Sequence, residues 1–565
     1  MNTLNQDCIY LYNLLRLSPE DTIILLLSIE QTRTAPVKSI QQFKKYIKSS
    51  ITDNTVINHI NRITNDANLS NNFDKLYEYA INDCIFAKHN IIEIYNELCS
   101  VSRHNRHDLI MTPPYIYELI YRIWGISEKD IIFDPCMGLG QILNQSPARR
   151  IIGAEIDEEL YSIAYLHALY CSKIPFLFCD DFRKINLPEK PKYAIMNPPY
   201  TMGTKSNPSG YEICYIDTLL RMMPKNSKVA VIVPQSTLNI TDHEKTSIRN
   251  SILESNQLDG IIPLNMYIYS NAIISTCIAL FTTGRPHGKK HLTKFFDFSN
   301  DGCFDTNKGH IPTAETYDLI EKIGYAWNNT DITYDDITIE SHHVEPTHDW
   351  SFGYFVSQNQ IPPQEIFEKT VNDYLLFYVS SILNNRSYLF KQAHSSTKNN
   401  RKKSSQNIRW DKFNLTELFD IEGTPRSKVT SEGVYPYLSS TVKNNGHNTY
   451  CDFFTNEPNC ICVESAINGF STYQEYPFAA MGHIERLIPK FNMTRCSALF
   501  IVAVLNHYHS NKYHYGYKAS QTRLRNESIL LPVDNHGNYN LGYMESFIDS
   551  IWSRQKVKIN NEFMR

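Results

Sequence analysis

Residues 130–143 read DIIFDPCMGLGQIL. An apolar run comes first, an acid at Asp134 follows it, and two glycines then precede an apolar, helix-compatible stretch. Gly138 and Gly140 let the backbone turn sharply and approach a ligand closely. Such a strand, turn and helix start is typical of the first strand of a nucleotide-binding α/β sheet. Since a GxG pair also occurs in ordinary turns, the rest of the chain has to support this interpretation.

Short β-rich runs alternate with helical stretches between about residue 106 and residue 300. Tyr115–Trp124 is a predicted helix, with Ile116, Leu119, Ile120 and Ile123 on one face. The predicted buried strands are 130–135, 149–157, 176–182, 193–200, 228–235 and 275–283. This alternation predicts a doubly wound α/β domain whose mixed sheet is mostly parallel.

Acidic residues end the first three of these strands. Asp134 follows the first strand, Glu155 and Ile156 end the second, and Asp181 with Phe182 ends the third. A carboxylate at the tip of the second strand can hold ribose hydroxyls, and an acid beside an aromatic ring suits an adenine. Each acid alone is compatible with an ordinary loop. Three in order predict a nucleoside pocket.

The glycine turn does not suit a pyrophosphate ligand. No GK[ST] follows the glycines, the third glycine of the dinucleotide fingerprint is missing, and the turn contains no basic residue. A cationic adenosine compound without phosphate fits better. The sequence therefore predicts S-adenosylmethionine as the cofactor, with its positive charges near Asp134.

Residues 195–202, IMNPPYTM, follow the fourth strand and carry the predicted chemistry. Pro198 and Pro199 fix φ and remove backbone donors, so Asn197 is held in an extended turn with its carbonyl exposed. A side-chain acceptor and a backbone acceptor can together bind both hydrogens of one amino group. Tyr200 offers a flat face to the ring that carries this amine. The alternative is a structural bend, including a cis-prolyl one, at the end of a strand.

These motifs, together with TPPYIYELI at 112–120, resemble the γ-class of DNA adenine-N6 methyltransferases, and in particular the modification subunit of type I restriction–modification systems. The resemblance covers about residues 109–325 and implies a Rossmann-like methyltransferase domain. It implies that Asn197, Pro198, Pro199 and Tyr200 are catalytic and that Tyr200 and Tyr269 stack on the target base. The cofactor residues that it implies are Thr112, Pro113, Asp134, Pro135, Gly138, Gly140, Glu155, Ile156, Asp181 and Phe182. No metal is implied.

Residues 408–560 resemble one half of a type I specificity subunit, that is, a target-recognition domain with a spacer helix. The pattern includes WDKFNLTELFDIEGT at 410–424 and KYHYGYKASQTRL at 512–524. Only one recognition domain is present, where the free subunit has two. The predicted phosphate contacts are Lys398, Arg401, Lys402, Lys403, Arg409, Lys412, Arg426 and Lys428. The run up to 403 is equally compatible with a solvated linker. Base-reading residues are expected on loops near 440–447, 468–475 and 516–525.

Four segments are therefore expected. They are a helical domain at 1–105, the methyltransferase domain at 106–325, a mainly helical extension with a basic linker at 326–407, and the α+β recognition domain with its C-terminal helix at 408–565. The stretch SPEDTIILLLSIEQ predicts a helix in the first segment, with Ser18 as its N-cap. Cys460 and Cys462 are expected to face inward from one strand.

Composition limits the classes of partner and of compartment. The net charge of −4 excludes a globally basic nucleic-acid coat, so DNA binding requires a local patch. Thirteen cysteines without a CxxC pair favour reduced thiols in the cytoplasm. The N-terminus lacks the basic region and cleavage site of a signal peptide, and no apolar run approaches a membrane span. A cytoplasmic bacterial or phage-encoded protein acting on the nucleoid is expected.

The predicted function is sequence-specific methylation of adenine N6 in double-stranded DNA. Two other classes stay open: an NPPY methyltransferase for RNA adenine or a protein glutamine, and a non-catalytic DNA-binding assembly subunit. A combined restriction–methylation enzyme is disfavoured, because residues 1–105 contain no Asp…Glu-x-Lys cluster on a strand. A homodimer and a separate nuclease or specificity partner are left open. The DNA target and the strand modified are not determined by the sequence.

Overall fold

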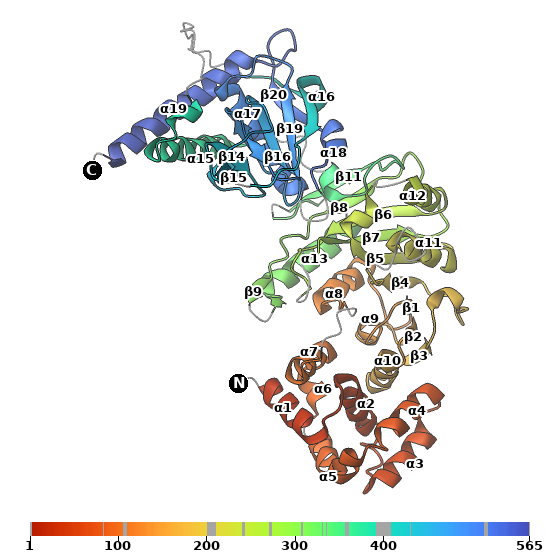
Figure 1. The fold of residues 1–565 in the computed structure, drawn as a ribbon. Helices are drawn as coiled ribbons and strands as arrows, with labels where there is room; N and C mark the ends of the chain where they lie inside the picture. Colours follow the sequence, from red (N-terminus) through yellow and green to blue (C-terminus); the bar gives the residue numbers. More distant parts are fainter. Residues whose placement is uncertain are drawn as a thin grey trace. The chain divides into compact units, whose positions relative to one another are not determined.

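The structure is a computed structural model that divides into two compact units, Met1–Ser351 and Phe352–Arg565 (Figure 1). Each unit has its own hydrophobic core. The residues it describes are 3–82, 84–104, 110–200, 211–239, 243–269, 274–306, 309–329, 332–334, 336–355, 361–390, 408–429, 431–513 and 518–563.

The first unit begins with a bundle of helices. These are α1 (Thr3–Leu15), α2 (Pro19–Glu30), α3 (Ile40–Ser50), α4 (Asn54–Ile63), α5 (Ala67–Asn82), α6 (Ile85–Lys88) and α7 (Ile91–Ser102). Every residue of α2 is buried, which makes it the centre of the bundle. The predicted cap is confirmed, because the backbone N–H of Asp21 donates to the Ser18 hydroxyl at 3.0 Å.

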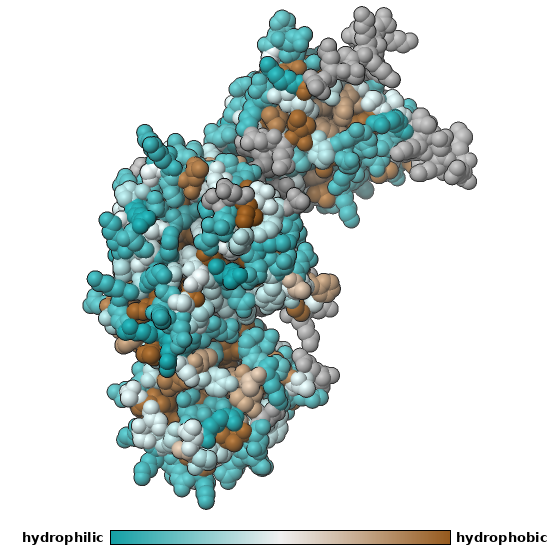
Figure 2. All heavy atoms as spheres, turned by 180° about the vertical axis from the view of Figure 1, so that it is seen from behind, coloured by the Kyte–Doolittle hydropathy of each residue, from teal (hydrophilic) through white to brown (hydrophobic). Residues whose placement is uncertain are grey.

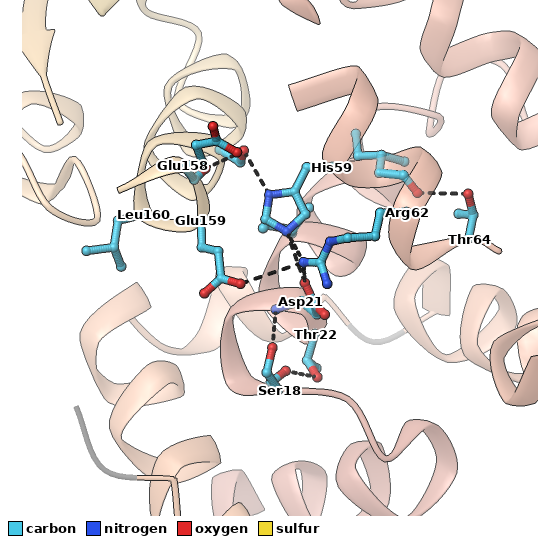
Figure 3. A network of polar contacts seen from close by, with 12 residues as sticks. Ser18, Asp21, Thr22, His59, Arg62, Thr64, Glu158, Glu159 and Leu160 are labelled. Atoms are coloured by element: carbon cyan, nitrogen blue, oxygen red, sulfur yellow. Dashed lines mark hydrogen bonds and ion pairs between the residues drawn. The ribbon is translucent and has the colours of Figure 1, made fainter. Parts of the chain in front are cut away.

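A polar network joins this bundle to α10 (Glu158–Tyr170), the helix that follows β2 (Arg150–Ala154) of the large sheet (Figure 3). The carboxylate of Asp21 accepts hydrogen bonds from Arg62 at 2.7 Å and from His59 at 3.1 Å. His59 also contacts the Ser162 hydroxyl at 3.3 Å, and Arg62 lies 3.7 Å from Glu159. Asp21 thus links α2 to His59 and Arg62 of α4, and these two side chains in turn contact α10.

The sheet of the first unit has nine strands in the order β11-β8-β6-β7-β5-β4-β1-β2-β3. They are β1 (Ile131–Asp134), β2 (Arg150–Ala154), β3 (Ile174–Phe178), β4 (Tyr193–Met196), β5 (Lys228–Pro234), β6 (Gln257–Pro263), β7 (Thr276–Thr282), β8 (Thr293–Phe296) and β11 (Ile339–His342). β1 pairs in parallel with β2 and β4, whereas β7 runs antiparallel to both β5 and β6. The predicted mixed, mostly parallel sheet is confirmed, while β6, β8 and β11 were not among the predicted strands.

Alternate residues of the strands face opposite sides of this sheet. Ile132, Ile195 and Ile232 share one core with the N-terminal bundle, with α8 (Pro114–Trp124) and with α13 (Ala314–Asn328). Phe133 and Val231 are buried outside that core, on the other face. α11 (Glu212–Met222) contacts β5, and α12 (His243–Ser255) packs against α11. The remaining elements of this unit are α9 (Gln141–Asn144), η1 (Phe182–Lys184), η3 (Gln235–Leu238), β9 (Phe304–Thr306) and β10 (Gly309–Ile311).

The second unit is an α+β structure. Its strands are β12 (Trp410–Asn414), β13 (Phe419–Gly423), β14 (Tyr435–Leu438), β15 (His447–Cys451), β16 (Cys460–Glu464), β17 (Ser471–Gln474), β18 (Ala479–Ala480), β19 (Ile484–Pro489) and β20 (Ser528–Pro532). They form sheets in the orders β12-β20, β13-β19-β16-β17 and β15-β14-β18. Cys460 and Cys462 on β16 are both 2% exposed, so the prediction that they face inward is confirmed.

Three long helices pack together in the second unit. They are α15 (Gln364–Leu383), α17 (Arg495–Lys512) and α19 (Leu541–Phe563). Phe367 of α15 contacts Phe500 of α17 and Phe547 of α19, with ring centroids 4.7 and 5.2 Å apart. The shorter elements are α14 (Phe352–Phe355), α16 (Leu415–Leu418), α18 (Gln521–Arg525), η4 (Ser387–Phe390) and η5 (Asn444–Gly446).

The two units cut across the four segments expected from the sequence. Residues 1–105 and the sheet share one unit and one core. The expected extension at 326–407 contributes β11 to the first unit and α15 to the second. None of the described helices is both long and apolar enough to cross a membrane. Hydrophilic residues cover most of the face seen in Figure 2, with hydrophobic ones scattered among them.

Replacing Asp21 by Ala is expected to lower the free energy of unfolding by about 1–3 kcal/mol, because His59 and Arg62 lose a shared, buried acceptor. Denaturant unfolding of the full chain measures this change. Asp74→Ala, which removes an exposed carboxylate on α5, is the matched control and should change stability much less. Equal stability of the two variants would contradict a structural role for the network.

Candidate active site at the carboxyl edge of the sheet

The predicted site residues follow four neighbouring strands that run in the same direction. β3, β2, β1 and β4 are parallel neighbours, so their carboxyl ends meet at one edge of the sheet. Glu155 directly follows β2, Asn197 directly follows β4, and Asp134 is the last residue of β1. The fold therefore places these three polar side chains along one edge.

The glycine turn is fixed to the tip of β2. Gly138 has φ 50° and Gly140 has φ 72°, values that favour glycine. A Cβ on Gly140 would also lie 2.7 Å from Cβ of Ala164 on α10. The N–H of Gly138 donates to Glu155 at 2.9 Å, and the N–H of Asp157 donates to the other oxygen of Glu155 at 3.0 Å. Glu155 thus holds the turn in place as well as ending the strand.

Asp134 is a buried carboxylate beside a second acid. One of its oxygens accepts from the N–H of Cys136 at 3.0 Å, and the other has no hydrogen-bond partner among the described residues. Burial raises the pKa of Asp134 to about 8, with the Cys136 N–H acting to lower it and the nearby Glu155 adding to the rise. Burial also raises the pKa of Glu155. A cationic ligand would relieve both carboxylates.

Asp181, which follows β3, is predicted to bind the cofactor, and it has a partner within the chain. Its carboxylate is paired with Arg183 at 2.6 Å, and this hydrogen bond lowers the pKa of Asp181. Arg183 in turn lies 5.0 Å from the ring centroid of Tyr215, and the buried Phe182 packs on the same ring. The sequence analysis did not predict the contacts of Arg183 and Tyr215. A cation two residues after an acid does not by itself indicate a binding pocket.

Ile156 offers an apolar face at the same edge of the sheet. Its side chain directly follows Glu155 and is 71% exposed, which is unusual for a large aliphatic residue next to a buried acid. Exposure is what a surface for a planar ring requires. The assignment of Ile156 to the cofactor site stays a prediction.

Asn197 lies in a buried polar network at the tip of β4. Its Nδ2 donates to the hydroxyl of Thr112 at 2.9 Å. Its Oδ1 is buried and has no hydrogen-bond partner among the described residues. The described chain contains no cis peptide bond, so Pro198 and Pro199 are both trans. The sequence did not show that Thr112, 85 positions away, fixes which way the Asn197 amide points.

Tyr200 and Tyr269 lie together next to Asn197. Their hydroxyls are 3.1 Å apart, their ring centroids are 6.3 Å apart, and the planes meet edge to face at 68°. The Tyr200 hydroxyl also donates to the carbonyl of Ile232 on β5 at 3.2 Å. Both side chains are buried. Stacking of either ring on a target base stays a prediction.

The predicted phosphate contacts fall into three groups. Lys398, Arg401, Lys402 and Lys403 lie outside the described residues. Arg409 and Lys412 are exposed on and beside β12, whereas Arg426 and Lys428 are exposed on the segment after β13. One predicted base-reading loop is partly wrong, because 471–474 forms the buried strand β17, whose Gln474 contacts His447 at 3.1 Å.

Two clusters of potential metal ligands occur among the described residues. One is Asp301, Cys303 and His310, and the other is Asp21, His59 and Glu159. In the first cluster, His310 lies 2.8 Å from Asp301 as a buried pair. The second cluster is the network of Figure 3, where Arg62 already supplies a cation. Both clusters are explained by pairing within the chain.

Replacing Asp134 by Asn should stabilise the protein increasingly between pH 4 and pH 8. The pKa of Asp134 is raised from its ordinary 3.8 to about 8 in the folded state, so the unfolded chain binds fewer protons in this window. Wild-type stability therefore falls as the pH rises through it, and the amide removes this dependence. Thermal unfolding at pH 5 and pH 9 without ligand measures the difference between the two proteins.

Asp130→Asn is the control with the opposite sign. Although burial acts to raise it, the pKa of Asp130 is lowered overall by Ser127 and Lys192. This variant should lose stability above pH 4. Equal pH dependence of wild type and Asp134→Asn would show that Asp134 titrates normally.

Two family models match parts of the chain. Residues 177–374 match the model described as N-6 DNA Methylase, and residues 407–562 match the model described as Type I restriction modification DNA specificity domain. The first match begins in β3 and the second covers β12 to α19.

Similar proteins carry related descriptions. The chain is 24% identical over 307 residues to the type II restriction enzyme and methyltransferase RM.BcgI of Heyndrickxia coagulans, covering 50% of this chain and 48% of that protein. It is 25% identical over 211 residues to the specificity subunit S.BcgI of the same organism, covering 35% of this chain and 61% of that subunit. The chain thus spans about half the length of RM.BcgI.

Among solved structures, a type I restriction–modification methyltransferase subunit from Streptococcus thermophilus is 16% identical, with a TM-score of 0.40 over 60% of this chain and 95% of that one. From the family matches, the chain contains an N-6 DNA methylase domain followed by a type I restriction–modification DNA specificity domain.

Proposed function

We propose that this protein transfers a methyl group from S-adenosylmethionine to N6 of a flipped-out adenine in double-stranded DNA, at a specific sequence. The observation that carries the proposal is the state of the Asn197 side chain. Its amide nitrogen is bound to Thr112, while its oxygen is buried and has no partner within the described part of the chain. A buried acceptor left unpaired costs free energy unless a ligand completes it.

An amino group is the ligand that suits this acceptor. In the proposed complex, N6 of adenine donates one hydrogen to Oδ1 of Asn197 and the other to a backbone carbonyl of the Asn197–Pro198 region. Both acceptors draw the nitrogen toward tetrahedral geometry, so its lone pair becomes available. The trans prolines keep the two acceptors in place before the substrate arrives, which is preorganisation.

The transfer then proceeds without a further catalytic base. S-adenosylmethionine supplies an electrophilic methyl on a positively charged sulfur. As the N6–carbon bond forms, the sulfur–carbon bond breaks and its electron pair stays on the sulfur. The methylated nitrogen loses one proton, which leaves to solvent by way of the acceptors around Asn197. The products are N6-methyladenine and S-adenosylhomocysteine.

The edge of the sheet fits this cosubstrate. Asp134 has a raised pKa and an oxygen that no described residue binds, and Glu155 is a second buried acid beside it. Together they suit the positive charges and ribose hydroxyls of S-adenosylmethionine. Pro135 belongs to the same turn, and Thr112 and Pro113 would lie at the methionine end. Phe182 and Ile156 supply the apolar surroundings of an adenine.

Duplex DNA requires base flipping before Asn197 can act, because N6 lies inside the stack. Residues 407–562 match a DNA specificity domain, and this match supports binding of double-stranded DNA by the second unit. The exposed Arg409, Lys412, Arg426 and Lys428 would contact phosphates. Action on the nucleoid in the cytoplasm stays a prediction from the sequence, and a homodimer and a separate nuclease or specificity partner stay open.

Asn197→Ala should reduce methylation of duplex DNA by about 100-fold or more, because the side-chain acceptor disappears. Thr112→Val, which removes only the hydroxyl that orients the amide, should reduce the rate by about 10-fold or more at saturating S-adenosylmethionine. Transfer of labelled methyl groups to duplex DNA, RNA and total protein measures both effects.

Asn61→Ala, an exposed asparagine on α4, is the matched control and should leave the rate unchanged. Label that appears only in RNA or protein would overturn the proposed substrate. Full DNA methylation by Asn197→Ala would overturn the proposed site.

A further inference from the structure

Two connections of the second unit come together beside β14. Residues 439–446 connect β14 to β15, and residues 465–470 connect β16 to β17. We call them the 440 loop and the 465 loop. They lie next to each other because Ser440 of the first loop donates a hydrogen bond to Glu464, the last residue of β16, at 2.9 Å.

The 440 loop is held in an uncommon backbone conformation. Asn444, Asn445 and Gly446 are consecutive left-handed residues, with φ of 52°, 53° and 83°. The side chain of Asn445 donates to the carbonyl of Tyr473 at 2.9 Å, and this hydrogen bond ties the loop to β17. Backbone strain of this kind persists only where the surroundings impose it, and it concentrates at functional sites.

Glu464 organises the 465 loop. Its carboxylate accepts from the backbone N–H groups of Ala466 at 2.6 Å, Ile467 at 2.9 Å and Asn468 at 3.2 Å, besides the Ser440 hydroxyl. Four donors use the acceptor sites that a carboxylate offers. Its charge is therefore satisfied within the protein, and Glu464 joins both loops into one rigid surface.

A hollow of about 270 Å³ lies between the two loops. Residues 440–443, Glu464, Ile467 and Asn468 line it. Lys443 is exposed, and Val442 and Ile467 are 53% and 47% exposed, so apolar side chains stand among polar ones at the surface. The Oδ1 of Asn468 accepts from the N–H of Phe470 at 3.2 Å, so the NH₂ group is the donor that it offers to a ligand.

Two predicted phosphate contacts lie on a segment that is hydrogen-bonded to β14. Arg426 and Lys428 flank Ser427, whose hydroxyl donates to the carbonyl of Ala480 at 2.8 Å. Ser427 also accepts from the hydroxyl of Tyr437 on β14, the strand that leads into the 440 loop, at 2.7 Å. The segment that carries these two cations is therefore fixed to the strand that leads into the 440 loop, and the hollow itself carries an ammonium group, an amide and two apolar side chains.

We propose that this hollow reads base-pair edges in the major groove of double-stranded DNA, and so determines part of the target sequence. This inference rests on the proposed function, since it takes DNA as the partner. Lys443 would donate to the O6 and N7 acceptors of guanine, and Asn468 to an acceptor of a neighbouring base. Val442 and Ile467 would contact thymine methyl groups. Arg426 and Lys428 would bind phosphates on either side.

A binding selection tests the proposal without relying on methyl transfer. The full-length wild type, Lys443→Ala and Asn468→Asp each select from a pool of randomised duplexes at fixed salt, and the bound DNA is sequenced. In Lys443→Ala, the preference for the wild-type base over the other bases should fall by about 10- to 100-fold at one or two positions of the selected motif. Asn468→Asp keeps the Oδ1 acceptor but replaces the donor, so preference at its position should shift toward cytosine, whose amino group is a donor.

Matched variants separate base reading from general binding. Lys369→Ala, an exposed lysine on α15, should select the wild-type motif. Lys428→Ala should weaken binding to all duplexes alike. It should also reduce the slope of the logarithm of the binding constant against the logarithm of the salt concentration by about 1 in magnitude. Unchanged melting temperatures confirm that the variants are folded. Because Asn197→Ala should select the same motif as wild type, failure of methylation and failure of base reading are distinguishable.

Three outcomes would overturn the proposal. The first is a wild-type motif selected unchanged by both Lys443→Ala and Asn468→Asp. The second is a uniform loss of binding across all sequences in these variants, which would assign the hollow to phosphate contact. A wild type that selects no motif would also contradict base reading by this surface.

Discussion

The position of β1 between β4 and β2, parallel to both, is the constraint on which the site depends. Parallel neighbours end at the same edge, so residues far apart in the sequence meet there. Asp134, Glu155 and Asn197 follow three different strands and become neighbours only through this pairing. A change of strand order would separate the predicted cofactor residues from the predicted catalytic ones while leaving every motif intact.

Hydrogen bonds at this edge determine which polar atoms stay available. Thr112 binds the nitrogen of Asn197 and leaves its oxygen, and Cys136 binds one oxygen of Asp134 and leaves the other. Both remaining atoms are buried, where an unpaired polar atom is unfavourable. The Asn197 oxygen lies where an amino group is the expected ligand, and the Asp134 oxygen lies where a cation is the expected ligand. The same fold gives Asp181 a partner in Arg183, so its carboxylate is already neutralised.

In the second unit, hydrogen bonds to a carboxylate hold two loops in place. Glu464 satisfies its charge with four donors and thereby gives two loops one fixed surface. Preorganised side chains lose little entropy when they bind, which favours specificity. The long helices α15, α17 and α19 form the core that supports this surface. Because α15 lies in the expected extension, the unit begins well before the region that resembles a specificity subunit.

Apolar periodicity, the glycine turn and the acidic strand ends determined the strands β1 to β5, the helix α8 and the kind of ligand expected at the sheet edge, because these signals are local. The strand order, β6 and the continuity of the N-terminal bundle with the sheet were decided by long-range packing. So were the anchoring of Asn197 by Thr112, the pairing of Asp181 with Arg183 and the contact between Ser440 and Glu464. Each depends on side chains brought together by the fold, and spacing along the chain carries no record of such contacts.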